Sequence, residues 1–306
     1  MAWLANFVAL LFLTAVVLAS ARGAASLWRR RREPIEPRRP VPWNGLHVLA
    51  IVAVSIVLQG MLPHAFGFQR HRKDDSAEAH DAESDVDPAQ ARAILLGTAT
   101  ANLLTVALAV AALHYGLGAS AADLGFDTAH LAADVRLGLT AFAALLIPIY
   151  AIQLVLTHWF KGEHPIERWI RAAPEPGLIA AAAITAVVVA PLAEEFIFRV
   201  LLQGWLERRW PPMPVDESLD GIAPIDPSPP AIRLEPIAIS AAIFALLHLG
   251  WPGDLRSDPI PLFVLAVMLG YLYQRTHRIW PSIVVHACLN AASMAALAAS
   301  VLAGAE

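Results

Sequence analysis

Two adjacent glutamates stand within an apolar run that is long enough to cross a membrane. The sixteen residues from Leu178 to Ala193 carry no charge, and Glu194 and Glu195 follow them before apolar residues resume. An ionised residue at the centre of a spanning helix costs about 2.5–3.5 kcal/mol on insertion scales. Such residues face a bundle interior or a water-filled cavity and commonly serve a function. The glutamate pair is therefore the first candidate for catalysis.

Helical spacing separates the two carboxylates. Glu195 and Arg199 are four residues apart, so they share a helix face and can form an ion pair. Glu194 points about 100° away and lacks this partner, which leaves one acid structural and the other free for chemistry. Pro191 is predicted to kink the helix and to free a backbone carbonyl near the acids. A buried ion-pair clasp between helices is the alternative interpretation.

Two later apolar segments add imidazoles and an amide. His248 follows Phe244 by one helical turn, and His286 and Asn290 lie one turn apart on a single face. A lone histidine in an apolar helix is ordinarily a core residue, but three helices that each carry such a group favour one shared polar site. Glutamate, histidine and asparagine can supply a general base, a proton shuttle and oxyanion donors. The same side chains can also ligate a metal.

The composition places these residues in a membrane protein. Of the 306 residues, 57% are hydrophobic and 16% are charged, whereas about a quarter of a soluble domain is charged. A spanning helix needs about 20 apolar residues, so we predict an all-α membrane protein, a bundle of about eight transmembrane helices. The net charge of −4 is too small to indicate a nucleic-acid partner. The predicted segments are 2–21, 44–62, 93–115, 137–158, 178–206, 236–249, 260–274 and 280–303.

Lysine and arginine are distributed unevenly between the connecting segments. With the N-terminus outside, the loops predicted to be cytoplasmic hold 13 of these residues and the outer loops hold 8. Cytoplasmic loops show this excess, so we predict an uncleaved first helix in the plasma (inner) membrane. A signal sequence cleaved near residues 19–21 is the alternative.

The chain is predicted to divide near residue 92. Residues 1–92 form an N-terminal two-helix extension with a basic cytoplasmic loop and an acidic outer loop, and residues 93–306 form the core. The basic run at 29–39 is expected to face anionic lipid. Eight prolines between residues 211 and 236 exclude a long helix there. Four tryptophans near segment ends fit an aromatic belt at the lipid surface: Trp43, Trp159, Trp251 and Trp280.

Three spaced motifs on successive apolar segments resemble a known family. They are EExxxR at Glu194, Glu195 and Arg199, FxxxH at Phe244 and His248, and HxxxN at His286 and Asn290. In this order they resemble the CPBP family, which includes CAAX prenyl endopeptidases of the Rce type, bacteriocin-processing enzymes and Abi proteins. The resemblance covers roughly residues 95–303 and includes the stretch ADLGFD at 122–127.

The resemblance implies an intramembrane endopeptidase. Its substrate would be membrane-associated: a hydrophobic or lipidated peptide, such as a CAAX-type peptide, reached within membrane lipid. By position, Glu194 and His248 would activate water, and His286 and Asn290 would stabilise the oxyanion. Glu195 and Arg199 would shape the site, with Phe198 and Phe244 expected in the substrate pocket.

Two questions stay open from the sequence. No HExxH motif occurs among the eleven histidines, and we expect no metal. A zinc ion held by Glu194, His248 and His286, with water as fourth ligand, fits the same residues. A proton-coupled transporter is the alternative function, because buried acids and histidines also form proton relays. A non-catalytic scaffold is a further reading, which the complete residue set opposes.

Overall fold

The computed structural model describes residues 2–33, 35–36, 40–69, 87–160, 164–209, 232–249 and 259–304. All regular secondary structure in these ranges is helical. The predictions for the acidic outer loop and the proline-rich segment concern residues that lie largely outside the described ranges, and so do Arg38, Arg39 and Trp251.

Each of the eight predicted segments coincides with a helix or a run of helices. Six are long and apolar enough to cross a membrane, and the described part of the chain is therefore that of a multi-pass membrane protein. The elements are α1 (Ala2–Arg30), α2 (Gly45–Ala65), α3 (Pro88–Leu117), α4 (Leu131–Leu156), a composite helix over Pro176–Arg209, α9 (Leu234–Leu246), α10 (Pro259–Thr276) and α11 (Trp280–Gly304). The short helix α5 (Pro165–Ala172) was not predicted.

The composite helix consists of five consecutive parts. They are α6 (Pro176–Ile184), the π-helical turn η1 (Thr185–Val189), α7 (Ala190–Glu195), the longer π-helical stretch η2 (Phe196–Gln203) and α8 (Gly204–Arg209). It contacts α3 on one side and α11 on the other, while α9 packs against η2 and α10. The pair of glutamates therefore lies in the middle of the bundle.

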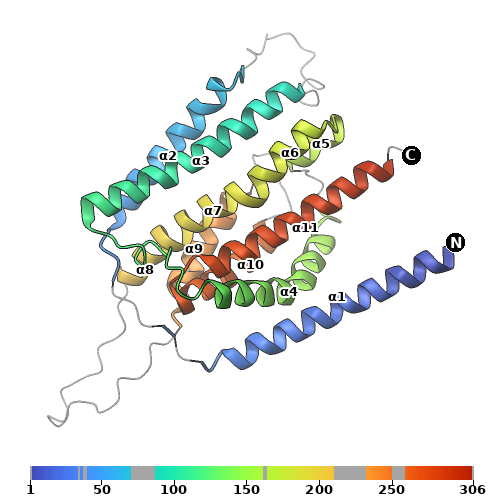
Figure 1. Ribbon diagram of the computed structural model, residues 1–306, viewed down its shortest axis with the longest axis horizontal. Helices are drawn as coiled ribbons and strands as arrows, with labels where there is room; N and C mark the ends of the chain where they lie inside the picture. The colour runs from blue at the N-terminus through green and yellow to red at the C-terminus, as the bar shows by residue number, and fades with distance from the viewer. Residues whose placement is uncertain are drawn as a thin grey trace.

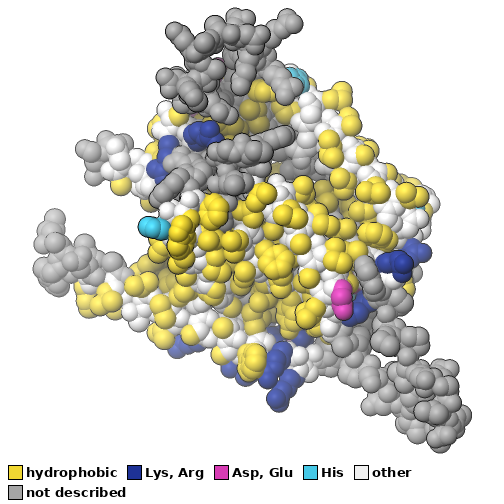
Figure 2. All heavy atoms as spheres, turned by 180° about the vertical axis from the view of Figure 1, so that it is seen from behind, with side chains coloured by type: hydrophobic (Ala, Val, Ile, Leu, Met, Phe, Trp, Pro, Cys, Tyr) yellow, Lys and Arg dark blue, Asp and Glu magenta, His cyan; other side chains and the backbone are white. Residues whose placement is uncertain are grey.

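The outer helices pack in pairs around this centre. Helix α2 lies along α3, and α1 lies along α4 (Figure 1). Seen from behind, the molecule presents a broad apolar face with arginines towards its margins (Figure 2). Such a face suits a lipid environment, and the polar residues of the centre are shielded from it.

The four connections that the sequence places on one side of the membrane meet at one end of the bundle. Hydrogen bonds join Glu36 and Asp134 to Arg278, and the Ile279 amide donates to the Gly125 carbonyl at 3.0 Å. His277 Nε2 lies 3.3 Å from Glu207 Oε2, and Arg208 Nη1 donates to the Val41 carbonyl at 3.1 Å. This clustering agrees with the predicted alternation of the helices.

Arg278 is the centre of the largest ion-pair group at this end. Its guanidinium donates from Nε to Asp134 Oδ2 at 2.6 Å and from Nη2 to Glu36 Oε1 at 2.9 Å. Burial opposes its charge, but the hydrogen bonds that it donates to Asp134 and Glu36 outweigh burial and raise the pKa of Arg278 above its ordinary value. The charge is therefore held at every accessible pH, and it ties the segment after α1 to the first turn of α4 and the start of α11.

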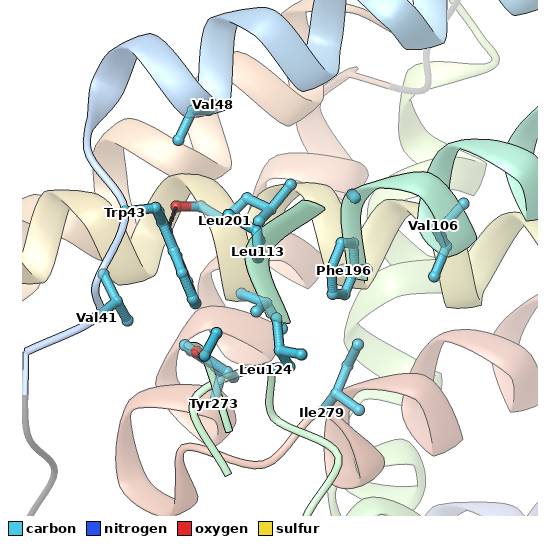
Figure 3. Close-up of a cluster of buried hydrophobic side chains, with 14 residues drawn as sticks. Val41, Trp43, Val48, Val106, Leu113, Leu124, Phe196, Leu201, Tyr273 and Ile279 are labelled. Atoms are coloured by element: carbon cyan, nitrogen blue, oxygen red, sulfur yellow. Dashed lines mark hydrogen bonds between the residues drawn. The ribbon is translucent and has the colours of Figure 1, made fainter. Parts of the chain in front are cut away.

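Trp43 corrects one prediction from the sequence. Instead of lying at the lipid surface, its side chain is fully buried, and its indole Nε1 donates to the Leu201 carbonyl at 3.1 Å. It belongs to a core cluster that also contains Val41, Val48 and Phe196 (Figure 3). The N-terminal extension thus contributes to the core, while the division of the chain near residue 92 stays a prediction.

Replacing Asp134 with asparagine should destabilise the protein, because the Arg278 charge would lose a partner whose side chain is only 2% exposed. We expect the free energy of unfolding in detergent to fall by about 2 kcal/mol. A matched control is Glu175→Gln, which breaks an ion pair with Arg92 whose side chains are 47% and 39% exposed; its cost should be under about 1 kcal/mol. Equal losses for the two variants would contradict the anchoring role of Asp134.

Candidate active site

The acid pair lies on a short α-helical stretch between two π-helical turns. In η1 the Ala190 amide donates to the Thr185 carbonyl, five residues back. The Ala186 carbonyl would next accept from residue 190 in an α-helix or from residue 191 in a π-helix. The first donor is engaged elsewhere, and Pro191 has no N–H. The local sequence thus leaves one carbonyl free in the middle of the bilayer.

Asn290 on α11 satisfies this carbonyl. Its amide Nδ2 donates to the Ala186 oxygen at 2.7 Å. Unpaired backbone groups in hydrocarbon cost several kcal/mol, so this bond is expected to fix α11 against η1. The sequence predicted a displaced carbonyl four residues before Pro191, whereas the carbonyl bonded from outside the helix is that of Ala186, five residues before it, because the helix is π-helical there. Its partner is a residue that the sequence had assigned to oxyanion binding. One N–H of the Asn290 amide is therefore used in a structural hydrogen bond to the backbone.

Glu195 lies at the centre of a buried charge network. Its Oε2 accepts from Arg199 Nε at 3.0 Å, and its Oε1 lies 3.0 Å from His286 Nδ1. Glu195 and Arg199 are fully buried, and the His286 side chain is 5% exposed. The predicted ion pair four residues apart is confirmed, and it extends to α11.

Glu194 occupies the more open side of the same imidazole. Its Oε2 lies 3.7 Å from His286 Nε2, and its side chain is 28% exposed. This separation is too long for a direct hydrogen bond and suits a group that a water molecule can bridge. His286 therefore has one ring nitrogen directed at a buried carboxylate and the other at an accessible one.

Helix α9 closes the site with aromatic and hydroxyl groups. Phe244 meets Phe198 edge-on with ring centroids 5.1 Å apart, and it contacts both His248 and His286 at 4.8 and 6.1 Å. The Arg199 guanidinium carbon lies 5.4 Å from the centroid of the same ring. His248 Nδ1 lies 2.8 Å from the Phe244 carbonyl. Phe244 is thus the ring on which both imidazoles pack.

Ser240 is a site residue that sequence reasoning missed. Its hydroxyl accepts from Arg199 Nη1 at 3.3 Å and donates to the Phe198 carbonyl at 2.8 Å. It is fully buried, one turn before Phe244 on α9. The four-residue spacing from Phe244 on one helix face was the available signal, but serines are common in spanning helices and this one carries no charge.

The polar cluster lies at membrane depth. At 1.5 Å per residue, Glu195 is about 21 Å along the helix from Arg209, and His286 is about 9 Å from Trp280. Both helices begin or end where the connections cluster, so the polar cluster lies within the spanning part of the bundle and not in a connection. The eight predicted site residues are thus brought together by direct contacts, with Asn290 one turn from His286; their chemical roles stay predictions.

The described residues do not form an obvious metal centre. Within them, no group of three histidine, cysteine, aspartate or glutamate side chains is placed to hold an ion. His286 turns one nitrogen to Glu195, and His248 turns one to its own helix. Contacts of this kind through Nδ1 are also made by histidines that bind a metal through Nε2, so the zinc alternative with Glu194, His248 and His286 stays open beside the metal-free prediction.

Asn290→Asp tests the structural bond to the Ala186 carbonyl. Aspartate keeps the shape but lacks the N–H donor, so the carbonyl would face an oxygen. We expect the free energy of unfolding in detergent to fall by about 1–3 kcal/mol, measured by denaturation. The control is Ser293→Ala, which removes an exposed hydroxyl from the same helix that bonds to Tyr150 at 2.8 Å. An Asn290→Asp protein as stable as the control would contradict the bond.

Comparison with known proteins supports the resemblance found in the motifs. Residues 176–292 match the family described as type II CAAX prenyl endopeptidase Rce1-like. No curated protein and no solved structure matches the chain. The matched segment contains the acid pair, Arg199, both histidines and Asn290. This match supports the resemblance of the segment to the CPBP family of membrane proteases.

Proposed function

We propose that the protein is an intramembrane endopeptidase in which Glu194 and His286 together activate a water molecule. The observation that carries the proposal is the position of His286 between two unlike carboxylates, with Nδ1 3.0 Å from buried Glu195 and Nε2 3.7 Å from accessible Glu194. An imidazole oriented by a buried acid on one side is suited to proton transfer on the other.

The proton balance of the reaction follows from this geometry. When Glu195 accepts from Nδ1–H, the Nε2 atom of neutral His286 carries a lone pair. A water molecule that hydrogen-bonds to Glu194 and Nε2 gives a proton to Glu194 as its oxygen adds to the carbonyl carbon of the substrate. The tetrahedral intermediate then breaks the C–N bond, and the proton passes from Glu194 to the leaving nitrogen.

The remaining polar groups are proposed to bind the oxyanion. Asn290 has a second N–H beyond the one bonded to Ala186, and His248 packs on the same Phe244 ring as His286. Donors that meet developing charge in a water-poor site are worth several kcal/mol, since one oxyanion donor contributes about 2.7–4 kcal/mol. His248 can also assist Glu194, as the sequence predicted.

The substrate class follows from depth and from the lining. Phe198 and Phe244 form an edge-to-face pair beside the acids, and the site is surrounded by spanning helices. These features favour a peptide that is hydrophobic or carries a lipid near the scissile bond. The family match makes a CAAX-type prenylated peptide the first candidate. We propose that it is cleaved in the plasma membrane without a metal. No contact among the described residues favours a transporter.

Glu194→Gln is the direct test of the proposed base. Glutamine keeps the size of the side chain but cannot take up the water proton, so cleavage of a prenylated CAAX peptide in detergent should fall about 10²–10⁴-fold. The matched control is Glu235→Gln, at an exposed carboxylate in the first turn of α9, which should retain wild-type activity. Cleavage by Glu194→Gln at the wild-type rate would exclude Glu194 as base.

Chelation tests the metal-free form of the mechanism. Incubation of the purified protein with 1,10-phenanthroline, followed by its removal, should leave the cleavage rate unchanged within about twofold. The non-chelating 1,7-phenanthroline serves as control for effects on the detergent or the substrate. Loss of activity that added zinc restores would contradict the proposal in favour of a bound ion.

A further inference from the structure

The segment between α1 and α2 makes its contacts with the helix that carries the acids. We define residues 40–44 as the strap; they precede α2 and lie outside the family match, which begins at residue 176. Val41 is 2% exposed and Trp43 is fully buried. A loop that connects two outer helices would ordinarily run over the surface, so its insertion into the core calls for a physical reason.

The strap is bonded to the composite helix from both sides. Trp43 Nε1 donates to the Leu201 carbonyl in η2 at 3.1 Å, a bond that Figure 3 shows as a dashed line. In return, Arg208 Nη1 in α8 donates to the carbonyls of Val41 at 3.1 Å and Trp43 at 2.8 Å. The three bonds reach the composite helix at two places, Leu201 near the end of η2 and Arg208 near the end of α8.

The bond from Trp43 adds a second donor near the end of η2. The Leu201 carbonyl also accepts from the Gly204 N–H at the C-cap of η2, and the two lone pairs of a carbonyl oxygen allow it to accept both bonds. The Leu201 carbonyl lies two residues after Arg199, whose Nε holds Glu195. Fixing Leu201 therefore fixes the turn from which Arg199 reaches the acid.

Apolar packing also holds the strap against η2. Trp43 shares its core cluster with Phe196, Val200 and Leu201, which are all fully buried members of η2. Gly45, immediately after the strap, has room for no side chain, because a Cβ atom there would lie 2.7 Å from the Trp205 ring. The strap is thus seated against the acid-bearing helix over two turns.

We propose that the strap is a positioning element of the active site: Trp43 holds η2 in register so that Arg199 keeps Glu195, and through it His286, in place. The proposal rests on the proposed peptidase function for its kinetic consequence. The strap itself touches no reacting group, so its effect passes through Arg199. The N-terminal part of the chain would then be required for catalysis although the family match does not include it.

The kinetic test is a double-mutant cycle between Trp43→Phe and Arg199→Lys. Phenylalanine keeps an aromatic ring but removes the N–H donor, and we expect kcat/KM per folded enzyme to fall about three- to tenfold. In the Arg199→Lys background the same change should have little further effect, because the two residues act in series. Full additivity of the two losses, or wild-type activity of Trp43→Phe, would overturn the proposal.

A matched control separates positioning from general loss of stability. Ser20→Ala removes a buried side-chain bond to a backbone carbonyl, from Ser20 to Ala144 at 3.2 Å, that also joins the N-terminal part to the core but ends on α4. It should leave kcat/KM per folded enzyme unchanged. If Trp43→Phe does not fold, Arg208→Gln loosens the strap from the other side and should show the same dependence on Arg199.

A structural readout keeps the proposal independent of the proposed function. Backbone amide hydrogen exchange over residues 196–203 should become faster in Trp43→Phe and remain at the wild-type rate in Ser20→Ala. If no CAAX peptide is cleaved by the wild type but exchange changes as expected, the peptidase proposal fails and the strap's hold on η2 stands. Amide exchange over residues 196–203 that is unchanged in both variants would refute the proposal that the strap holds η2 in register.

Discussion

The ion pair between Glu195 and Arg199 sets the conditions for the rest of this bundle. Neither side chain is exposed, and the desolvation of two buried charges is offset only when their remaining donors and acceptors are also satisfied. Arg199 gains one further partner in Ser240 on α9, while its Nη2 stays buried without a hydrogen bond, and Glu195 gains His286 on α11. The pair therefore brings three chain segments together, and losing Ser240 or His286 would remove a hydrogen bond from a buried charged group.

The same requirement gives the site its chemical asymmetry. Glu195 is tied down by two partners, whereas Glu194, next to it in sequence, keeps 28% of its side chain exposed. Because the two residues point in different directions from one helix, one carboxylate can orient the imidazole while the other meets water. The π-helical turns on both sides of the pair, and the proline before it, adjust the direction of this short stretch and create the carbonyl that Asn290 binds.

Residues from other segments of the bundle stabilise the irregular composite helix through hydrogen bonds to its backbone. Asn290 supports η1, Trp43 supports η2, and Ser240 bonds to the Phe198 carbonyl. Irregular backbone at membrane depth is tolerated where protein groups satisfy it. The Phe126 ring, from the turn before α4, stacks on Phe196 at 5.8 Å with an interplanar angle of 10°, which adds an apolar contact on the same stretch.

The sequence by itself determined the spanning helices and the ionisable and amide residues that they bring together. Long apolar runs leave few alternatives to spanning helices, and charged or amide groups within them are costly enough to identify. The local spacing of Glu195 and Arg199 determined their ion pair, because that contact lies within one helix. The division between a free and a bound carboxylate followed from the same helical geometry.

Only the tertiary structure decided what lies across from each of these residues. It showed that His286 lies between the two glutamates, that Asn290 is committed to a backbone carbonyl, and that Ser240 accepts a hydrogen bond from Arg199. It also moved Trp43 from an expected place at the lipid surface into the core. The physical reason is that these contacts join segments up to 158 residues apart, and hydrophobicity shows that a residue avoids water without showing whether it meets lipid or protein.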